Sequence, residues 1–266
     1  MKPVHAYIYL AKMKLMITLV YRFEVIASVM SSAITMLSTI FLWKTVYHAI
    51  KNVDNFNEKQ MITYAIISAL LGMVFTFNVE KVLYDRVFQG DIAIDFFRPA
   101  SILLCYFAED VGSAISALMC KFIPMTVVIV VFFVKPGPAS PLALVLFIVS
   151  SVLSYGILWL IDAIVGVFHF KSISLGNIGY IKNVLVSLLS GSIIPIWFFP
   201  EKIRNVLRVF PFQYTYQTPI GIYIGTYDCY DAVFLMMVQC LWVCILFIVL
   251  HVMWNRTSKN ILIQGG

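Results

Sequence analysis

The sequence predicts an all-α polytopic membrane protein with six transmembrane helices in a single domain over residues 1–266. Hydrophobic residues make up 61% of the chain and charged residues only 12%, whereas about a quarter of the residues of soluble domains are charged. The mean hydropathy is +0.92, and apolar segments of the ~20 residues needed to cross a bilayer recur between polar connectors. The net charge of +6 is attributed to membrane topology and contact with anionic lipid, and nucleic-acid binding is not supported.

The N-terminal segment, residues 3–14, mixes apolar positions with two lysines. This pattern predicts an interfacial helix at the cytoplasmic surface, with a ragged start to the first span as an equally weighted alternative. The first span has its core at residues 25–46, and Arg22 and Glu24 are expected near the inner interface, where snorkelling or mutual pairing limits their cost. A polar loop at residues 51–59 leads to the second span at residues 61–79.

A charged connector at residues 85–101 separates the second span from the third. Gly90 breaks the preceding segment, and Asp91 can cap a new helix. Pro99 prevents that helix from continuing past Arg98. The connector is therefore predicted to hold one short cytoplasmic helix.

The short helix is expected to be amphipathic. Its apolar residues Ile92, Phe96 and Phe97 recur at helical spacing, and Asp91 and Asp95 mark a polar side four residues apart. In a membrane protein, such an aromatic side either docks on a soluble partner or lies on the bilayer surface. Docking on a partner is the preferred interpretation.

The third span begins near Ile102 and carries polar residues in or near it. Glu109, Asp110 and Lys121 are charged, and Pro124 interrupts the hydrogen-bond ladder. The helix is therefore predicted to bend and to face protein or water rather than lipid.

Turn residues at 135–141 end the third span, and residues 142–168 form the fourth. A polar connector at residues 169–182 follows. The fifth span is placed at residues 184–199 and is short, with Gly191 and Pro195 punctuating it.

Residues 200–228 fit neither a span nor an ordinary loop. Pro200 and Glu201 suit a helix start, and the turns that follow place apolar and basic residues on different faces. The apolar positions are Ile203, Val206, Leu207 and Phe210, and the basic positions are Lys202, Arg204 and Arg208. After Pro211 the segment is rich in glycine and in tyrosines suited to the headgroup layer. It is predicted to form an extracellular re-entrant helical hairpin, followed by the sixth span at residues 232–254 and a polar tail at residues 255–266.

The orientation follows from the basic residues. Lysine and arginine are moderately more frequent in the segments that would face the cytoplasm if both termini lie inside. This arrangement places the connector at residues 85–101 in the cytoplasm and the hairpin at residues 200–228 outside.

No catalytic or metal-binding pattern is present in the sequence. The histidines form no ligand pair, the cysteines have no metal-type spacing, and the chain lacks the phosphate loop that would bind ATP. The acidic residues Glu109, Asp110 and Asp162 could mark a proton path, although a solvated or interfacial role is favoured. The site residues are thus expected to include no catalytic group, no metal ligand and no cofactor ligand.

Two segments resemble the permease subunits of ABC type-2 exporters. The first is QGDIAIDFFRPAS in the connector, and the second is SGSIIPIWFFPEKIRNVLRVFPF after the fifth span. The connector is similar to that of a small bacterial group in which it reads roughly G-x-(I/L)-x-x-x-(L/F)-(L/F)-R-P. The matching residues are Gly90, Ile92, Phe96, Phe97, Arg98 and Pro99, and in the later segment Gly191, Pro195, Phe199, Pro200, Pro211 and Phe212.

The resemblance implies a transmembrane subunit that works with separate ATPases. Two ATP-binding cassette subunits, which hold the ATP and Mg, would dock from the cytoplasm, and a second permease subunit, either a sister permease or a copy of this chain, would pair with it. The docking residues would be Gly90, Asp91, Ile92, Asp95, Phe96, Phe97, Arg98 and Pro99, and the extracellular hairpin residues Pro195, Phe199, Pro200, Pro211 and Phe212. The expected location is the bacterial cytoplasmic membrane, with both termini in the cytoplasm.

The expected function is export of a hydrophobic or amphipathic substrate, such as a peptide, lipid or drug, by alternating closure of the permease dimer. The alternative is a self-contained protein, either a proton-coupled carrier that uses Glu109, Asp110 or Asp162, or a membrane-embedded enzyme.

Overall fold

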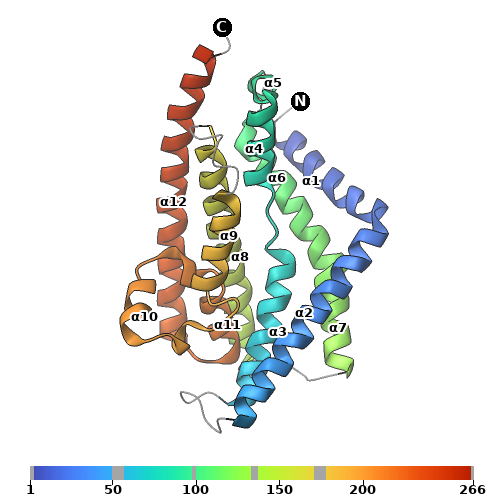
Figure 1. The fold of residues 1–266 in the computed structure, drawn as a ribbon, viewed down its shortest axis with the longest axis vertical. Coiled ribbons are helices and arrows are strands. Elements are labelled where there is room, and N and C mark those ends of the chain that lie inside the picture. The colour runs from blue at the N-terminus through green and yellow to red at the C-terminus, as the bar shows by residue number, and fades with distance from the viewer. Residues whose placement is uncertain (1–2, 50–56, 98–99, 133–136, 171–177, 265–266) are drawn as a thin grey trace.

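The computed structural model describes residues 3–49, 57–97, 100–132, 137–170 and 178–264, and within these ranges it contains helices and turns but no strand (Figure 1). In chain order the elements are α1 (Pro3–Val20), α2 (Arg22–Ala49), α3 (Glu58–Val74), α4 (Val79–Gln89), α5 (Ile92–Phe96), α6 (Ile102–Ala117), η1 (Leu118–Phe122), α7 (Ile123–Phe132), α8 (Pro141–Phe168), α9 (Ile178–Leu189), η2 (Ile196–Phe198), α10 (Glu201–Leu207), η3 (Pro211–Tyr214), α11 (Gln217–Ile224) and α12 (Cys229–Gln264). The all-α class is confirmed for these residues.

Among the residues that the structure describes, five stretches are long and apolar enough to cross a bilayer: Arg22–His48, Glu58–Gln89, Ile102–Val131, Pro141–Phe168 and Cys229–Lys259. They correspond to the predicted first, second, third, fourth and sixth spans. The predicted fifth span at residues 184–199 is wrong in both bounds, because α9 begins at Ile178 and ends after 12 residues at Leu189. The predicted interruption of this segment at Gly191 is confirmed, because Gly191 has a φ of +84°, a conformation that glycine adopts readily.

The N-terminal helix is longer than predicted and lies against the third span. α1 continues beyond residue 14 to Val20, and α2 begins directly after Tyr21. α1 packs along α6, and their closest approach is at Gly112, where an added Cβ would lie 2.7 Å from the Cα of Ala11.

The second span is broken. α3 ends at Val74, residues 75–78 leave the helix, and α4 continues to Gln89. The prediction of one helix over residues 61–79 is therefore wrong, and residues 85–89, assigned to the connector, belong to α4. Aromatic rings secure the break, because Phe75 packs edge-on against Tyr216 at 5.3 Å and Phe77 lies 4.8 Å from Tyr155.

The third span is continuous through a π-helix. α6, η1 and α7 follow one another without a gap, and η1 ends directly before the turn that contains Pro124. Proline cannot donate a backbone hydrogen bond and its ring clashes with the carbonyl four residues earlier, so a widened turn accommodates it. The predicted interruption at Pro124 is confirmed.

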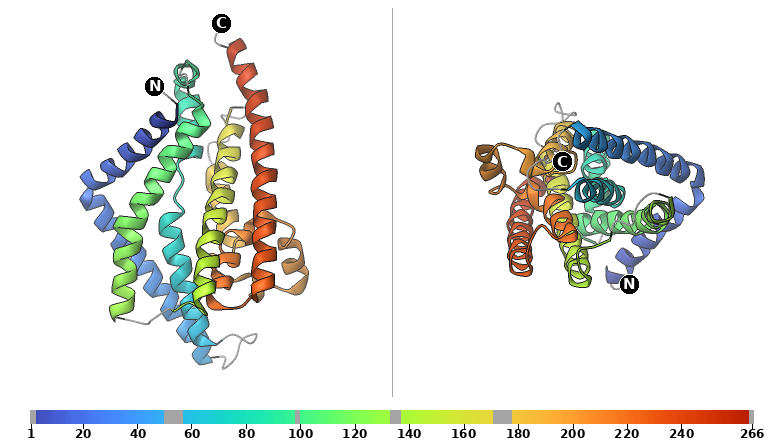
Figure 2. Two further views of the ribbon diagram at one scale, coloured as in Figure 1. Left: turned by 180° about the vertical axis from the view of Figure 1, so that it is seen from behind. Right: turned by 90° about the horizontal axis from the view of Figure 1, so that it is seen from below.

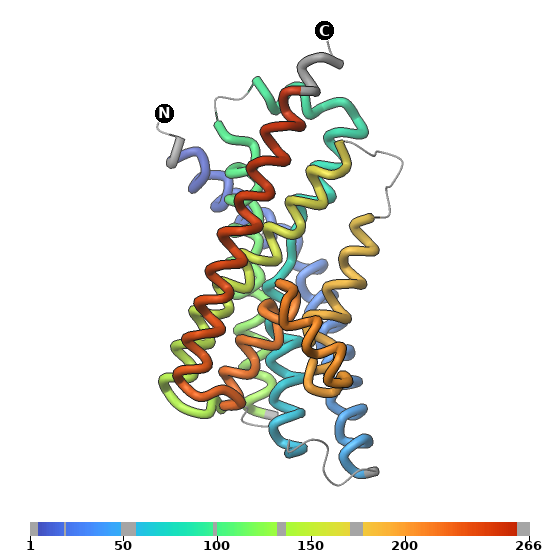
Figure 3. Tube along the Cα trace, turned by 90° about the vertical axis from the view of Figure 1, so that its left-hand side faces the viewer, coloured from blue at the N-terminus to red at the C-terminus, as the bar shows by residue number. Residues whose placement is uncertain are grey.

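The last span extends through the predicted tail. α12 runs from Cys229 to Gln264, so residues 255–264 are helical rather than a separate polar tail. At 1.5 Å per residue its 36 residues measure about 54 Å, well beyond the ~30 Å of hydrocarbon in a bilayer. The far end of α12 reaches the level of α4 and α5, and α1 starts at the same end of the bundle (Figures 1 and 3).

The hairpin after α9 is folded into the bundle rather than lying on its surface. α9 stops partway along the bundle, and the chain from residue 190 onward folds beside α3 and α8 in the half opposite α5 (Figures 1 and 3). Every residue of α11 is buried. Among the tyrosines expected at the headgroup layer, Tyr214, Tyr216 and Tyr223 are buried within the protein and each is at most 9% exposed.

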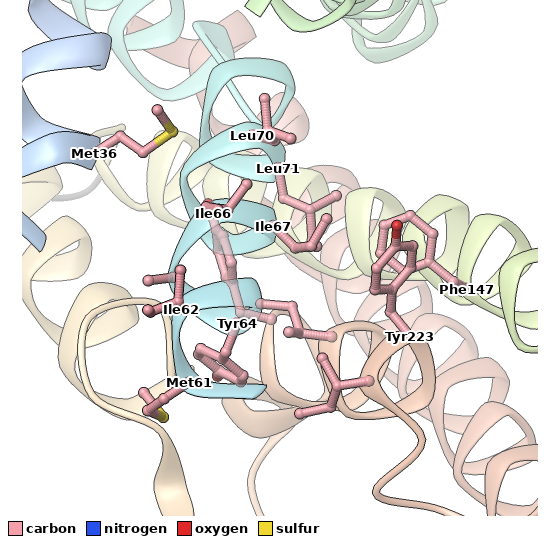
Figure 4. Packing of buried hydrophobic residues seen from close by; sticks show 14 of the residues in the cluster. Met36, Met61, Ile62, Tyr64, Ile66, Ile67, Leu70, Leu71, Phe147 and Tyr223 are labelled. Carbon is pink, nitrogen blue, oxygen red and sulfur yellow. The ribbon is translucent and has the colours of Figure 1, made fainter. Parts of the chain in front are cut away.

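α3 forms the centre of the main apolar core (Figure 4). Its residues Met61, Tyr64, Ile66 and Leu70 are at most 1% exposed. Viewed from below, α3 lies between α2, the third span, α8 and the hairpin (Figure 2). The most buried span therefore leads directly into the broken segment at residues 75–78.

The close α1–α6 contact predicts that Gly112 tolerates no side chain. Gly112→Ala should lower the free energy of unfolding by about 1–3 kcal/mol, because the methyl group overlaps the Ala11 backbone. The matched control is Gly156→Ala on α8, where the new Cβ would lie 3.7 Å from Val243 Cγ2, an ordinary contact. Denaturant titration in mixed micelles measures both variants, and equal stabilities would contradict the packing.

Candidate functional site

Two buried carboxylates hold the start of α4. Asp110 Oδ1 accepts a hydrogen bond of 3.1 Å from the backbone N–H of Asn78, and Asp162 Oδ2 accepts one of 3.1 Å from that of Glu80. These donors belong to the first turn of α4, where backbone N–H groups lack partners within the helix. Carboxylates are also favoured there by the helix dipole.

The other oxygens of the two carboxylates are also bound. Trp159 Nε1–H donates a hydrogen bond of 3.1 Å to Asp110 Oδ2, and Lys182 on α9 forms an ion pair with Asp162 Oδ1. Asp110 is 3% exposed and Asp162 is 4% exposed. The solvated or interfacial role favoured for these residues is therefore wrong, because they join α6 and α8 to the broken second span.

The side chain of Glu80 also holds the first turn of α4. Its Oε1 lies 2.7 Å from Nε2 of His169, whose side chain is fully buried, and the ring of His169 packs edge-on against Tyr84 at 4.8 Å. Glycines allow this close approach: a Cβ at Gly166 of α8 would lie 2.8 Å from Leu83 Cδ1, and one at Gly179 of α9 would overlap the carboxylate of Glu80. α4 is thus clamped against both helices.

α5 is joined to α4 through a tight turn at Gly90, whose φ is +80°. Arg86 on α4 reaches across the turn to Asp91 at 3.6 Å and to Asp95 at 3.7 Å. Asp95 also accepts a hydrogen bond of 2.9 Å from the hydroxyl of Tyr106. These contacts fix the position of α5 relative to α4.

The predicted faces of α5 are partly wrong. Asp91 precedes the helix but makes no side-chain cap, and Asp95, assigned to a polar side, is 2% exposed. Ile92 is buried, and Phe96 stacks on Trp254 of α12 at 5.8 Å, whereas Phe97 is 89% exposed. Of the expected docking residues, Ile92, Asp95 and Phe96 therefore face inward, whereas Gly90, Asp91 and Phe97 are partly or largely exposed. Arg98 and Pro99 lie outside the described residues.

An exposed apolar surface, which we call the tip, lies at the end of α4 and α5. It consists of Phe88, Ile94 and Phe97, which are 66%, 61% and 89% exposed. The sequence pattern identified Phe97 but missed Phe88 and Ile94. Ile94 lies three residues before Phe97, a spacing that could have indicated this shared face.

The expected hairpin residues lie at turns and helix starts. Pro195 precedes η2, Phe199 follows it, and Pro200 precedes α10, while Pro211 opens η3 and is buried. Phe212, the second residue of η3, is partly buried. These residues therefore shape the backbone of the hairpin.

Polar contacts that the sequence did not reveal tie the hairpin to the core. The hydroxyl of Tyr64 lies 2.6 Å from the carbonyl oxygen of Gly191 and 2.9 Å from Gln217 Oε1. Gln239 of α12 donates from Nε2 to the carbonyl oxygen of Tyr214 at 2.7 Å and accepts from the Ser150 hydroxyl at 2.9 Å. These bonds link α3, α8 and α12 to the hairpin.

Cavities flank the break and the hairpin. A pocket of about 450 Å³ opens beside residues 75–78, between α8 and α9, and includes Lys81, Asp162 and Lys182 among its lining residues. Another of about 720 Å³ lies between the hairpin and α12, lined in part by Arg204 and Arg208. Open space that basic side chains partly line thus exists beside the break and beside the hairpin.

The carboxylate contacts predict a large cost for removing Asp162. Asp162→Ala should lower the free energy of unfolding by about 3–5 kcal/mol, because Lys182, which is only 12% exposed, loses its ion-pair partner and the backbone N–H of Glu80 loses its acceptor. Asp162→Ala combined with Lys182→Met should cost less than the single change. Glu109→Ala is the control, since its 3.3 Å pair with Lys14 is partly exposed and worth about 1 kcal/mol or less. Equal losses for Asp162→Ala and Glu109→Ala in a denaturant titration would contradict the assignment.

Comparison with known proteins identifies the family. Neither the curated proteins nor the solved structures gave a match. A family model described as ABC-2 family transporter protein matches residues 33–265, which include every element from α3 onward. The chain therefore belongs to the ABC-2 family of transporter membrane proteins.

Proposed function

We propose that this chain is the non-catalytic permease subunit of an ATP-driven exporter. Two ATP-binding cassette subunits, which hold the ATP and Mg, dock from the cytoplasm, and a sister permease or a second copy of this chain completes the transport path. The cargo is hydrophobic or amphipathic, such as a peptide, lipid or drug, and it moves outward by alternating closure of the permease dimer. Membership of the ABC-2 family supports this assignment.

The observation that carries the proposal is the exposed tip at the end of α4 and α5, two helices that the contacts of Arg86 join. Phe88, Ile94 and Phe97 are exposed at the same end of the bundle as the start of α1 and the end of α12 (Figure 1). Ile94 and Phe97 lie beyond the apolar stretch that ends at Gln89, and clustered exposed apolar side chains mark sites of protein or membrane interaction. A force applied to the tip passes through the Arg86 contacts into α4 and reaches the break at residues 75–78, beside the 450 Å³ pocket.

The proposed topology has six crossings. The fifth crossing consists of α9 together with the hairpin segment that follows it, because α9 alone is too short to span a bilayer. Both termini and α5 lie in the cytoplasm, and α10 lies outside. The protein is assigned to the bacterial cytoplasmic membrane.

We favour the exporter over the proton-coupled carrier, because the acidic residues that a proton path would use have protein partners in this structure. Asp110 and Asp162 are committed to α4, and Glu109 pairs with Lys14. A carboxylate that carries protons must be released from its partners in each cycle, and here that release would detach α4 from the bundle.

The tip predicts that Phe97 contributes to docking without stabilising the chain. Phe97→Ala should weaken binding of the co-purifying ATPase subunit roughly ten-fold, as expected for a contact residue at a protein interface. The thermal stability of the chain should not change, because the side chain is 89% exposed. Affinity is measured by titration of the purified ATPase onto the solubilised permease.

The control for this experiment is Phe210→Ala, an aromatic residue after α10 that is 46% exposed. It should leave the affinity for the ATPase unchanged. Absence of any co-purifying ATPase, or equal affinity for Phe97→Ala and the unmodified chain, would rule out docking at the tip. Phe96→Ala should behave differently and lower stability, because Phe96 stacks on Trp254.

The topology predicts that Cys229 is reached from outside the cell. Cys229 is exposed at the start of α12, so a variant that keeps only this cysteine should react with a membrane-impermeant maleimide in intact cells. In the matched variant, Cys229→Ser with Arg256→Cys, labelling should require broken cells, since Arg256 is exposed near the other end of α12. The reverse pattern would overturn the orientation.

A further inference from the structure

A groove lined by both polar and apolar groups lies between α2, α3 and the π-helix η1. Its volume is about 240 Å³, which is smaller than the pockets that enclose whole drug-sized ligands. Hydroxyl-bearing residues and one lysine dominate its lining, which comprises Ser28, Ser31, Ser32, Thr35, Ala69, Gly72, Met73, Thr76 and Lys121. The groove therefore suits a small polar group that accepts hydrogen bonds.

Lys121 lies deep within the third span. Ten uncharged residues separate it from Asp110, and thirteen uncharged residues separate it from Lys135. At 1.5 Å per residue, these stretches correspond to about 15 Å and 20 Å of helix. An ammonium group at such depth is costly unless an anion or water accompanies it, and ionisable residues within spans commonly mark functional sites.

Lys121 has no carboxylate partner among the residues that the structure describes. Glu109 pairs with Lys14, and Asp110 binds Asn78 and Trp159. Glu24 lies one turn before Ser28 on α2 and makes no ion pair with Lys121. The positive charge in the groove therefore lacks an internal counter-ion.

The neighbouring hydroxyl groups are also available. Within the described residues, the side chains of Ser28, Ser31 and Ser32 make no hydrogen bond, while Thr35 donates to the carbonyl oxygen of Ser31 at 3.1 Å. Next to them on α2, the apolar residues Met30 and Ile34 are 61% and 64% exposed. A polar head could thus lie at Lys121 while an apolar tail follows the outer surface of α2.

We propose that this groove binds the anionic head group, a phosphate or a carboxylate, of an amphiphile within the membrane. Lys121 supplies the charge, and the serines of α2 donate hydrogen bonds to the anionic oxygens. The proposal deepens the proposed function and rests on it where the amphiphile is the cargo, because it then defines the charge of the exported molecule. A bound anionic lipid has the same chemistry.

The test measures binding to the full-length permease in neutral maltoside micelles without any ATPase. Dodecyl phosphate is the probe, and the thermal unfolding midpoint is followed as its concentration increases. The unmodified chain should be stabilised, Lys121→Arg should keep the response, and Lys121→Gln should need at least ten-fold more probe, since a charge-assisted hydrogen bond is lost. Lys202→Gln, which removes an exposed lysine on α10, is the matched control and should respond like the unmodified chain.

The probe chemistry separates the outcomes. Zwitterionic dodecylphosphocholine and inorganic phosphate should each give a weaker shift than dodecyl phosphate. An equal shift with inorganic phosphate would overturn the amphiphile assignment, and an equal response of Lys121→Gln and the unmodified chain would overturn the site. Because no ATPase is present, these failures leave the proposed function untouched.

Two further arms distinguish the sources of the ligand. If the ligand is a resident lipid, native mass spectrometry should detect an anionic phospholipid on the unmodified chain that Lys121→Gln has lost. If the ligand is cargo, dodecyl phosphate should stimulate the ATPase of the complete complex, and Lys121→Gln should abolish that stimulation. A negative result in both arms would contradict the proposal.

Discussion

The architecture depends on a helix that starts inside the membrane protein at the break in the second span. The first turn of α4 exposes backbone N–H groups that have no partner within the helix, and Asp110 and Asp162 accept hydrogen bonds from two of them. In a low-dielectric interior an unpaired backbone donor is costly, so the break is stable only because α6 and α8 supply these oxygens. This constraint explains why charged residues lie within apolar spans of the third and fourth crossings.

The same constraint links the interior to the end of the bundle that carries α5. α4 is held in its first turn by the two carboxylates and by the Glu80–His169 pair, at its middle by the packing of Tyr84 on His169, and near its end by Arg86. Because these contacts hold α4 along its whole length, we expect α4 and α5 to move together. Displacement at α5 would therefore appear at the break and at the pocket beside it, whereas a flexible connector would dissipate it.

Hydropathy and helix signals predicted much of the fold but little of its interior. The apolar runs located the long helices, and Pro124, Gly191 and the turn at Gly90 marked their interruptions. The break at residues 75–78 gave no such signal, because its partner Asp110 is 32 residues distant in the chain and only the folded structure brings them together. The burial of the hairpin tyrosines could not be predicted, because tyrosine suits both the headgroup layer and a core that offers its hydroxyl a partner, as the carbonyl oxygen of Arg208 does for Tyr214.

Hydrogen exchange at the break tests the central claim most directly. In the purified complex with its ATPase, backbone exchange of residues 75–78 would be compared with and without a non-hydrolysable ATP analogue, with the first half of α8 as an internal reference. The account predicts that nucleotide binding changes exchange at the break and in α4 but not in the reference segment. Unchanged exchange at the break, despite a nucleotide-dependent change at α5, would show that movement of α5 does not pass through α4 to residues 75–78. That result would contradict the account.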